Sequence, residues 1–211
     1  MNVPFYRNPD DSHCFQASLK MTIEAFYPDK IMSFLELDGI TCKDPDLYTW
    51  PFAGMEWMLK NGFEVLIIEN FDMIKFISDP TNYLIEFYGY EVGSDQISNS
   101  DISSVVKWAK KSMDFMARIK EERIPTFEDI CSLLKRGYLL IVNINANVIW
   151  GNQGYCGHFI VIKDFEDDIL IINDSGDFHG ENQRIQRSKF EEAWYYPDSN
   201  AGNCYAFKRR D

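Results

Sequence analysis

The order in which two hydrophobic periodicities appear along the chain constrains its fold most strongly. Up to about residue 125, apolar residues recur mainly at helical spacing, whereas from Tyr138 onward they alternate or form short β-branched runs. Helices followed by antiparallel strands are typical of an α+β protein built from two packed layers. The sequence therefore predicts an N-terminal helical lobe packed on a C-terminal antiparallel β-sheet.

Capping residues and proline or glycine positions locate the individual elements. We expect helices over residues 14–27, 33–39, 51–60, 71–77, 83–91, 102–119 and 126–137. The methionine and aromatic stripe of residues 102–119 is most simply core packing, although it could instead line a ligand groove. Strands are expected over residues 63–68, 138–145, 158–164, 168–173 and 205–208. The last strand is predicted at a sheet edge, and a Ser188–Glu191 capping box predicts a helix over residues 188–194.

The chain length suits one folding unit with two lobes. With 211 residues, of which 45% are hydrophobic, the chain can bury a substantial core. We expect a single domain over residues 1–211, divided into three parts. Residues 1–69 form the helical lobe, residues 70–124 a helical insertion, and residues 125–211 a mainly β lobe.

Charge and cysteine usage limit the classes of partner. The 21 basic and 33 acidic residues give a formal charge of −12, which repels nucleic acid and anionic membrane surfaces. Five widely spaced cysteines with no Cys-x-x-Cys pair indicate free thiols in a reducing compartment. Without a spanning segment or signal peptide, the chain is expected in the cytoplasm. No cofactor is expected, and the sequence does not indicate an oligomeric state.

A cysteine lies in the first turn of the first predicted helix. Asp10, Asp11 and Ser12 are acceptable N-caps, so Cys14 falls at the positive end of the helix dipole. That field, helped by a nearby imidazolium, lowers a thiol pKa from about 8.5 toward neutrality. Because a free cysteine alone is more often an inert core residue, the nucleophile hypothesis requires a base elsewhere in the chain.

A predicted hairpin supplies that base. His158 opens one strand and Asp174 ends the next, and a tip of residues 165–167 would place them directly opposite each other on one face. A shift of one residue would separate them and make Asn173 the orienting candidate. In chemical terms, Cys14 is the candidate nucleophile, His158 the acid–base and Asp174 the group that fixes the imidazole.

Three motifs together resemble a known family. Val3-Pro4-Phe5-Tyr6 leads to Cys14-Phe15-Gln16-Ala17-Ser18-Leu19, and Gly157-His158-Phe159-Ile160-Val161-Ile162 and Ile172-Asn173-Asp174-Ser175-Gly176 follow late in the chain. The set is similar to the papain-fold cysteine peptidases related to bacteriocin-processing peptidases. The resemblance implies a Cys-His-Asp hydrolase acting on a peptide or small amide substrate. It covers the two ends of the chain and leaves most of residues 70–124 unexplained, which we expect to be a helical insertion over the substrate groove.

The motifs depart from that family in two places. The family usually has Gln six residues before the nucleophile as an oxyanion donor, and this chain has the shorter Asn8 there. Phe15-Gln16 and Ser175 also replace the residues that commonly follow the cysteine and the aspartate. Gln16 could donate the amide instead, but a residue two places along a helix points elsewhere, so Asn8 is the preferred candidate.

Two other classes of protein remain open from the sequence. A papain-fold protein could bind peptides without turnover. Alternatively, His13-Cys14 and Cys156-x-His158 could bring two thiolates and two imidazoles to a zinc ion, although their spacing is not that of a standard zinc site. His179 is expected in a surface loop, and Cys42, Cys131 and Cys204 are expected to be structural.

Overall fold

The computed structural model describes residues 1–10, 12–176 and 180–210. The predicted cap Asp11 and the predicted loop residue His179 lie outside these ranges. In the described part of the chain, no helix is long and apolar enough to cross a bilayer.

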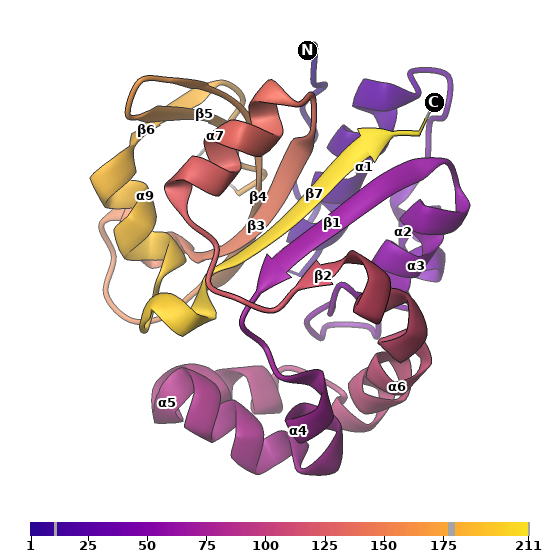
Figure 1. Cartoon of the computed structure of the whole chain (residues 1–211), viewed down its shortest axis with the longest axis vertical. Coiled ribbons are helices and arrows are strands. Elements are labelled where there is room, and N and C mark those ends of the chain that lie inside the picture. The colour runs from indigo at the N-terminus through magenta and orange to yellow at the C-terminus, as the bar shows by residue number, and fades with distance from the viewer. Residues whose placement is uncertain (11, 177–179, 211) are drawn as a thin grey trace.

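A seven-stranded sheet in the order β2-β1-β7-β3-β4-β5-β6 organises the molecule (Figure 1). Its strands are β1 Phe63–Glu69, β2 Lys120–Glu121, β3 Leu139–Asn145, β4 Gly157–Glu166, β5 Ile169–Asn173, β6 Gln183–Gln186 and β7 Asn203–Arg209. β7 pairs with β1 on one side and β3 on the other. The predicted edge position of the last strand is therefore wrong, because β1 from the N-terminal lobe extends the sheet beyond it.

Alternating side chains of the strands build one hydrophobic cluster on each face of the sheet. Ile141, Val161 and Phe207 point into one cluster, whereas their neighbours Leu140 and Ala206 and others point into the second. Helices cover both faces, since α1 packs against β4, and α7 and α9 pack against β3 on the other side (Figure 1). The α+β class is confirmed, but the expectation of only two layers is wrong.

The helices follow the predicted order with changes at their ends, except that α8 was not predicted. They are α1 Cys14–Phe26, α2 Phe34–Thr41, α3 Phe52–Lys60, α4 Met73–Ser78, α5 Pro80–Ser98, α6 Ile102–Ile119, α7 Phe127–Lys135, α8 Ala146–Trp150 and α9 Arg187–Trp194. Ser33 and Thr126 form capping boxes. The Ser188 box is wrong, because Gln186 is the N-cap of α9 and makes no side-chain cap bond.

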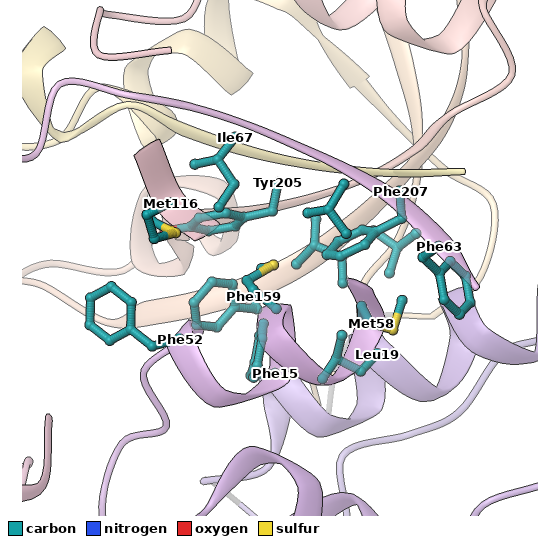
Figure 2. Close-up of a cluster of buried hydrophobic side chains, with 14 of the residues drawn as sticks. Phe15, Leu19, Phe52, Met58, Phe63, Ile67, Met116, Phe159, Tyr205 and Phe207 are labelled. Atoms are coloured by element: carbon teal, nitrogen blue, oxygen red, sulfur yellow. The ribbon is translucent and has the colours of Figure 1, made fainter. Parts of the chain in front are cut away.

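The core between α1, α3 and the sheet fixes the position of the N-terminal helix (Figure 2). Phe15 of α1 packs on Phe159 of β4 with ring centroids 4.9 Å apart, and Ser18 Oγ donates to the Phe159 carbonyl at 3.3 Å. Met116 of α6 is buried in the same cluster, which confirms core packing for the predicted methionine stripe. The start of α1 is therefore held against the start of β4.

Helices α4, α5 and α6 lie at one end of the molecule, in the part of the chain predicted as a helical insertion and called the insertion below (Figure 1). Gly89 interrupts α5 with φ 75° and ψ 170°, so the segment folds back on itself. Gly93 lies so close to the preceding half that a Cβ there would be 2.6 Å from the Leu84 carbonyl oxygen. The insertion thus depends on two glycines for its shape.

The hairpin of β4 and β5 differs from the predicted one. Glu166 pairs with Ile169, so the tip is Asp167-Asp168 and not residues 165–167. A bulge between Ile162 and Asp164 then shifts the register by one residue, and beyond it Val161 pairs with Asn173. His158 is consequently not directly opposite Asp174. However, the one-residue shift at the bulge returns the two side chains to the same face of the sheet.

Candidate active site

Cys14 is the first residue of α1 and is half-buried. The N-cap is His13, without a side-chain cap bond, so the predicted caps Asp10 and Ser12 are wrong. Asp10 instead accepts a hydrogen bond from the Ser12 amide at 2.7 Å and pairs with His13 Nδ1 at 2.7 Å. The polar side chains before Cys14 therefore shape the loop, while the helix terminus itself faces the site.

The surroundings of Cys14 favour its thiolate. Burial alone would raise the pKa of the thiol, but a hydrogen bond with the His158 imidazole and contacts with the backbones of Phe159 and Phe15 lower it overall. Burial raises the pKa of Cys42, Cys131 and Cys204. Cys14 is thus chemically distinct from these three thiols.

His158 lies between Cys14 and Asp174. Its Nε2 is 2.8 Å from Asp174 Oδ1, so Nδ1 is the ring nitrogen left to interact with Cys14. Burial would lower the pKa of His158, but the hydrogen bonds with Asp174 and Cys14 raise it to about 10. The three residues that the sequence predicts together are therefore in contact as a Cys–His–Asp series.

Asp174 is held in place by groups on two segments. Its Oδ1 also accepts from the Gly176 amide at 2.9 Å, and Trp150 Nε1 lies 3.3 Å from its Oδ2. The Trp150 ring packs on His158 with centroids 5.6 Å apart. No sequence signal marks Trp150, because α8 is only five residues long and has no periodicity.

Asn8 connects the loop before Cys14 to the loop after Asp174. Its backbone amide donates to the Ser175 carbonyl at 2.9 Å. Its side-chain Oδ1 accepts from the backbone amides of His13 at 3.2 Å and Asp10 at 3.3 Å. The side-chain oxygen is thereby fixed on the loop backbone, and the Nδ2 group is the part of Asn8 that remains available as a donor.

The comparisons with known proteins identify the fold. No family model and no curated protein matches the chain. The peptidase domain of Streptococcus ComA, a bifunctional ABC transporter, superposes with a TM-score of 0.52 at 15% identity, covering 99% of this chain and 100% of that domain. The chain has the fold of the C39 peptidases. This finding confirms the predicted resemblance to papain-fold, bacteriocin-processing peptidases.

Two further C39-type structures agree with this assignment of the fold. A double glycine motif protease from an AMS/PCAT transporter, in complex with its leader peptide, has a TM-score of 0.50 at 15% identity and covers 99% of this chain and 92% of that one. A Bacillus anthracis protein described as a C39-like peptidase has a TM-score of 0.50 at 14% identity, with coverage of 100% and 96%.

A cavity opens beside Cys14 in this C39-like fold. The empty space there, counted out into open solvent, amounts to about 880 Å³. Cys14 and Phe15 line it from α1, Tyr48 and Trp50 from the segment before α3, and Tyr88 from the insertion. The helical insertion therefore forms part of the wall of the space next to the candidate nucleophile.

The alternative residues considered from the sequence are engaged elsewhere. Gln16 is fully buried, and its Nε2 donates to Thr41 Oγ1 at 2.9 Å and Thr49 Oγ1 at 2.8 Å, so it supports the helical lobe. Asn173 pairs with Val161, and its Oδ1 accepts from the Asn182 amide at 3.1 Å. Neither residue takes part in the contacts around His158.

The described ranges contain no cluster of metal-ligating side chains that would support the zinc hypothesis. No group of three or more His, Cys, Asp or Glu residues there is arranged to hold a metal ion. His13 is turned toward carboxylates on both sides, with Nδ1 2.7 Å from Asp10 Oδ1 and Nε2 3.1 Å from Asp38 Oδ1. His158 is engaged by Cys14 and Asp174, so the two histidines do not converge on one point.

Proposed function

We propose that the protein is a cysteine-nucleophile hydrolase that cleaves a peptide or a related amide bond. The observation that carries this proposal is the buried His158, which interacts with the Cys14 thiol through one ring nitrogen and with Asp174 through the other. A thiolate paired with an imidazolium, which is itself oriented by a carboxylate, is the arrangement that activates a cysteine for acyl transfer.

The reaction follows from these roles. The Cys14 thiolate attacks the carbonyl carbon of the substrate and forms a tetrahedral oxyanion, and imidazolium His158 then protonates the departing amine. The neutral imidazole next removes a proton from water, which attacks the thioester and releases the acid. Asp174 keeps the ring orientation throughout, through the 2.8 Å contact with Nε2. An amine in place of water would give acyl transfer by the same chemistry.

We assign the oxyanion to two donors, the backbone amide of Cys14 and Nδ2 of Asn8. The helix terminus at Cys14 presents backbone N–H groups and a positive field toward this position. Asn8 is one methylene shorter than glutamine, but its backbone bond to Ser175 and its Oδ1 bond to the His13 amide hold it next to the nucleophile. These two bonds support its role as the second donor.

The fold also supports a peptide as substrate. One of the similar structures is a double glycine motif protease bound to a leader peptide. The present chain has a cavity beside Cys14 in which an extended segment could place a side chain. We therefore place peptides before small amides as the substrate class.

Hydrolysis of an internally quenched peptide library tests the proposal. Wild-type protein should cleave a subset of peptides, and Cys14→Ser should remove that activity while Cys42→Ser, which replaces an exposed thiol, retains it. If the wild-type protein and Cys14→Ser both bind peptides but the wild type cleaves none, the result would contradict the hydrolase and favour a peptide-binding protein of the same fold.

A further inference from the structure

The cavity beside Cys14 has a composition that points to a particular side chain. Its described lining includes no Lys, Arg, His, Asp or Glu, and aromatic rings make up a large part of it. Tyr48, Trp50, Tyr88, Tyr155 and Tyr205 all face this space. Rings that surround a cavity on several sides attract cations through their negative faces, as well as apolar groups.

Carboxylates lie behind the hydroxyl groups of the lining tyrosines. Tyr196, also in the lining, donates to Glu91 Oε2 at 2.9 Å, and the Tyr205 hydroxyl donates to Glu69 Oε2 at 3.0 Å. The Tyr48 hydroxyl interacts with Asp95. A phenol that donates to a carboxylate has a more electron-rich ring, so these pairs strengthen the attraction for a cation.

Of the three carboxylates behind the tyrosine hydroxyls, only Glu69 has a cation nearby among the described residues. Lys120 Nζ is 3.9 Å from Glu69 Oε1 and offsets that carboxylate. Within the described residues, neither Asp95 nor Glu91 forms a salt bridge; the Asp95 carboxylate interacts with two neutral groups, Asn99 Nδ2 at 3.0 Å and the Tyr48 hydroxyl. Asp95 and Glu91 are therefore the two carboxylates near the cavity that no salt bridge in the described part of the chain neutralises. Burial raises the pKa of Asp95, so its charge is lost at a higher pH than that of an ordinary aspartate.

Three amide side chains of the lining donate to other groups of the protein. Asn203 Nδ2 donates to the carbonyls of Asn143 and Ala201, both at 3.2 Å, and Asn145 Nδ2 donates to the Gly154 carbonyl at 3.1 Å. Gln96 Nε2 donates to the Tyr155 hydroxyl at 3.2 Å. With these three amides engaged and no cationic side chain in the described lining, an acidic side chain would exchange its hydration for neutral donors alone.

We propose that this cavity is a specificity pocket for the cationic side chain of a peptide, an arginine or a lysine close to the bond that Cys14 attacks. The aromatic walls from the 48–50 segment and β7 stack on the guanidinium or enclose the ammonium. Asp95 and Glu91 of α5 supply the charge behind them. This inference rests on the proposed function for the substrate's orientation, while the binding that it describes does not require turnover.

Binding measurements on Cys14→Ser separate the pocket from the chemistry. Calorimetric titration with capped tripeptides acetyl-Ala-Xaa-Ala-amide compares arginine with citrulline, its neutral isostere, and lysine with norleucine. We expect the arginine peptide to bind roughly tenfold to thirtyfold more tightly than the citrulline peptide. Added salt should weaken the binding of the arginine peptide and leave the binding of the citrulline peptide unchanged.

Charge-neutralising variants locate the effect. Asp95→Asn and Glu91→Gln should each lower the preference for arginine over citrulline by about threefold or more, with the citrulline affinity unchanged. Glu166→Gln is the matched control, since Glu166 pairs with Arg184 at 2.8 Å on the β4–β5 hairpin and does not line the cavity. Equal binding of arginine and citrulline peptides to Cys14→Ser would overturn the proposal.

The two proposals can fail separately. If the wild-type protein cleaves peptides with no preference for arginine or lysine near the scissile bond, the pocket assignment is wrong and the hydrolase stands. If Cys14→Ser prefers the arginine peptide but the wild-type protein cleaves none of the library, the pocket stands and the hydrolase is wrong.

Discussion

At the scale of single residues, the candidate site contains reactive residues, Cys14 and His158, and residues such as Trp150 that position them. Cys14 takes its lowered pKa from His158 and from the backbones of Phe159 and Phe15, and His158 takes its raised pKa of about 10 from Asp174 and Cys14. Each of these residue types occurs in a local structure that suits its chemistry, which is why the sequence alone was enough to select them. Trp150 could not be selected in this way, because its role depends on tertiary contacts such as those with Asp174 and the His158 ring.

Asn8 allows the oxyanion role to be tested apart from its structural role. Asn8→Asp keeps an oxygen that can accept from the His13 and Asp10 amides but removes the Nδ2 donor. We expect kcat to fall about a hundredfold or more in steady-state assays, as for the loss of one oxyanion donor. Asn8→Gln restores the donor and should recover part of the activity.

Thermal melting and the pH dependence of Cys14 alkylation serve as controls for this pair. The melting temperature of Asn8→Asp should stay close to that of the wild type. The alkylation profile reports any effect of the added carboxylate on the thiolate. A wild-type kcat in Asn8→Asp would show that Asn8 is only a loop residue.

At the scale of elements, the bulge in β4 determines whether the base and its orienting group can meet. The turn at Asp167-Asp168 by itself sets a register in which His158 and Asp174 would lie on opposite faces, and the extra residue Lys163 corrects it. A bulge leaves little trace in a pattern of alternating hydrophobics. The sequence could therefore predict the hairpin and the partners, but not the register that joins them.

Removing the bulge should uncouple the pair. Deletion of Lys163 forces the β4–β5 ladder to slip or the turn to change, whereas Lys163→Ala keeps the extra residue. We expect the deletion to reduce peptide hydrolysis at least about a hundredfold, and Lys163→Ala to remain near wild type. Circular dichroism checks that both variants retain the sheet. Full activity in the deletion variant would contradict the importance of the register.

The insertion provides a second test at this scale. A Cβ at Gly93 would meet the backbone of Leu84 and Ile85 within 3.0 Å, so Gly93→Ala should push apart the two halves of α5 that carry Tyr88 and Gln96 into the cavity wall. We expect a loss of about 1–3 kcal/mol in the free energy of unfolding. Gly39→Ala is the control, since no atom lies within 4 Å of a Cβ there.

Substrate kinetics distinguish a local change in the wall from damage to the nucleophile. Gly93→Ala should raise KM for cleaved peptides, while the rate of Cys14 alkylation stays at the wild-type value. A lower alkylation rate in this variant would mean that the insertion supports the thiolate itself.

At the scale of the whole molecule, one sheet brings together residues from opposite ends of the chain. From the N-terminal lobe, α1 packs on β4 and β1 pairs with β7, and both of these strands follow residue 138. Cys14 therefore meets His158 across the same core that holds Phe15 against Phe159 (Figure 2). Periodicity predicted most of the individual elements. The central place of β7 and the second helical face were not predictable, because long-range pairing depends on the relative stability of alternative arrangements.

The proposed hydrolase activity depends on a reactive thiolate at Cys14 that His158 maintains. The most direct measurement is the pH dependence of iodoacetamide labelling, followed by mass spectrometry for each of the five cysteines. Near pH 6, where an ordinary thiol is less than about 1% ionised, Cys14 should be labelled first, and His158→Ala should slow its labelling roughly tenfold or more. Equal labelling of Cys14 and the exposed Cys42, unchanged by His158→Ala, would contradict the account.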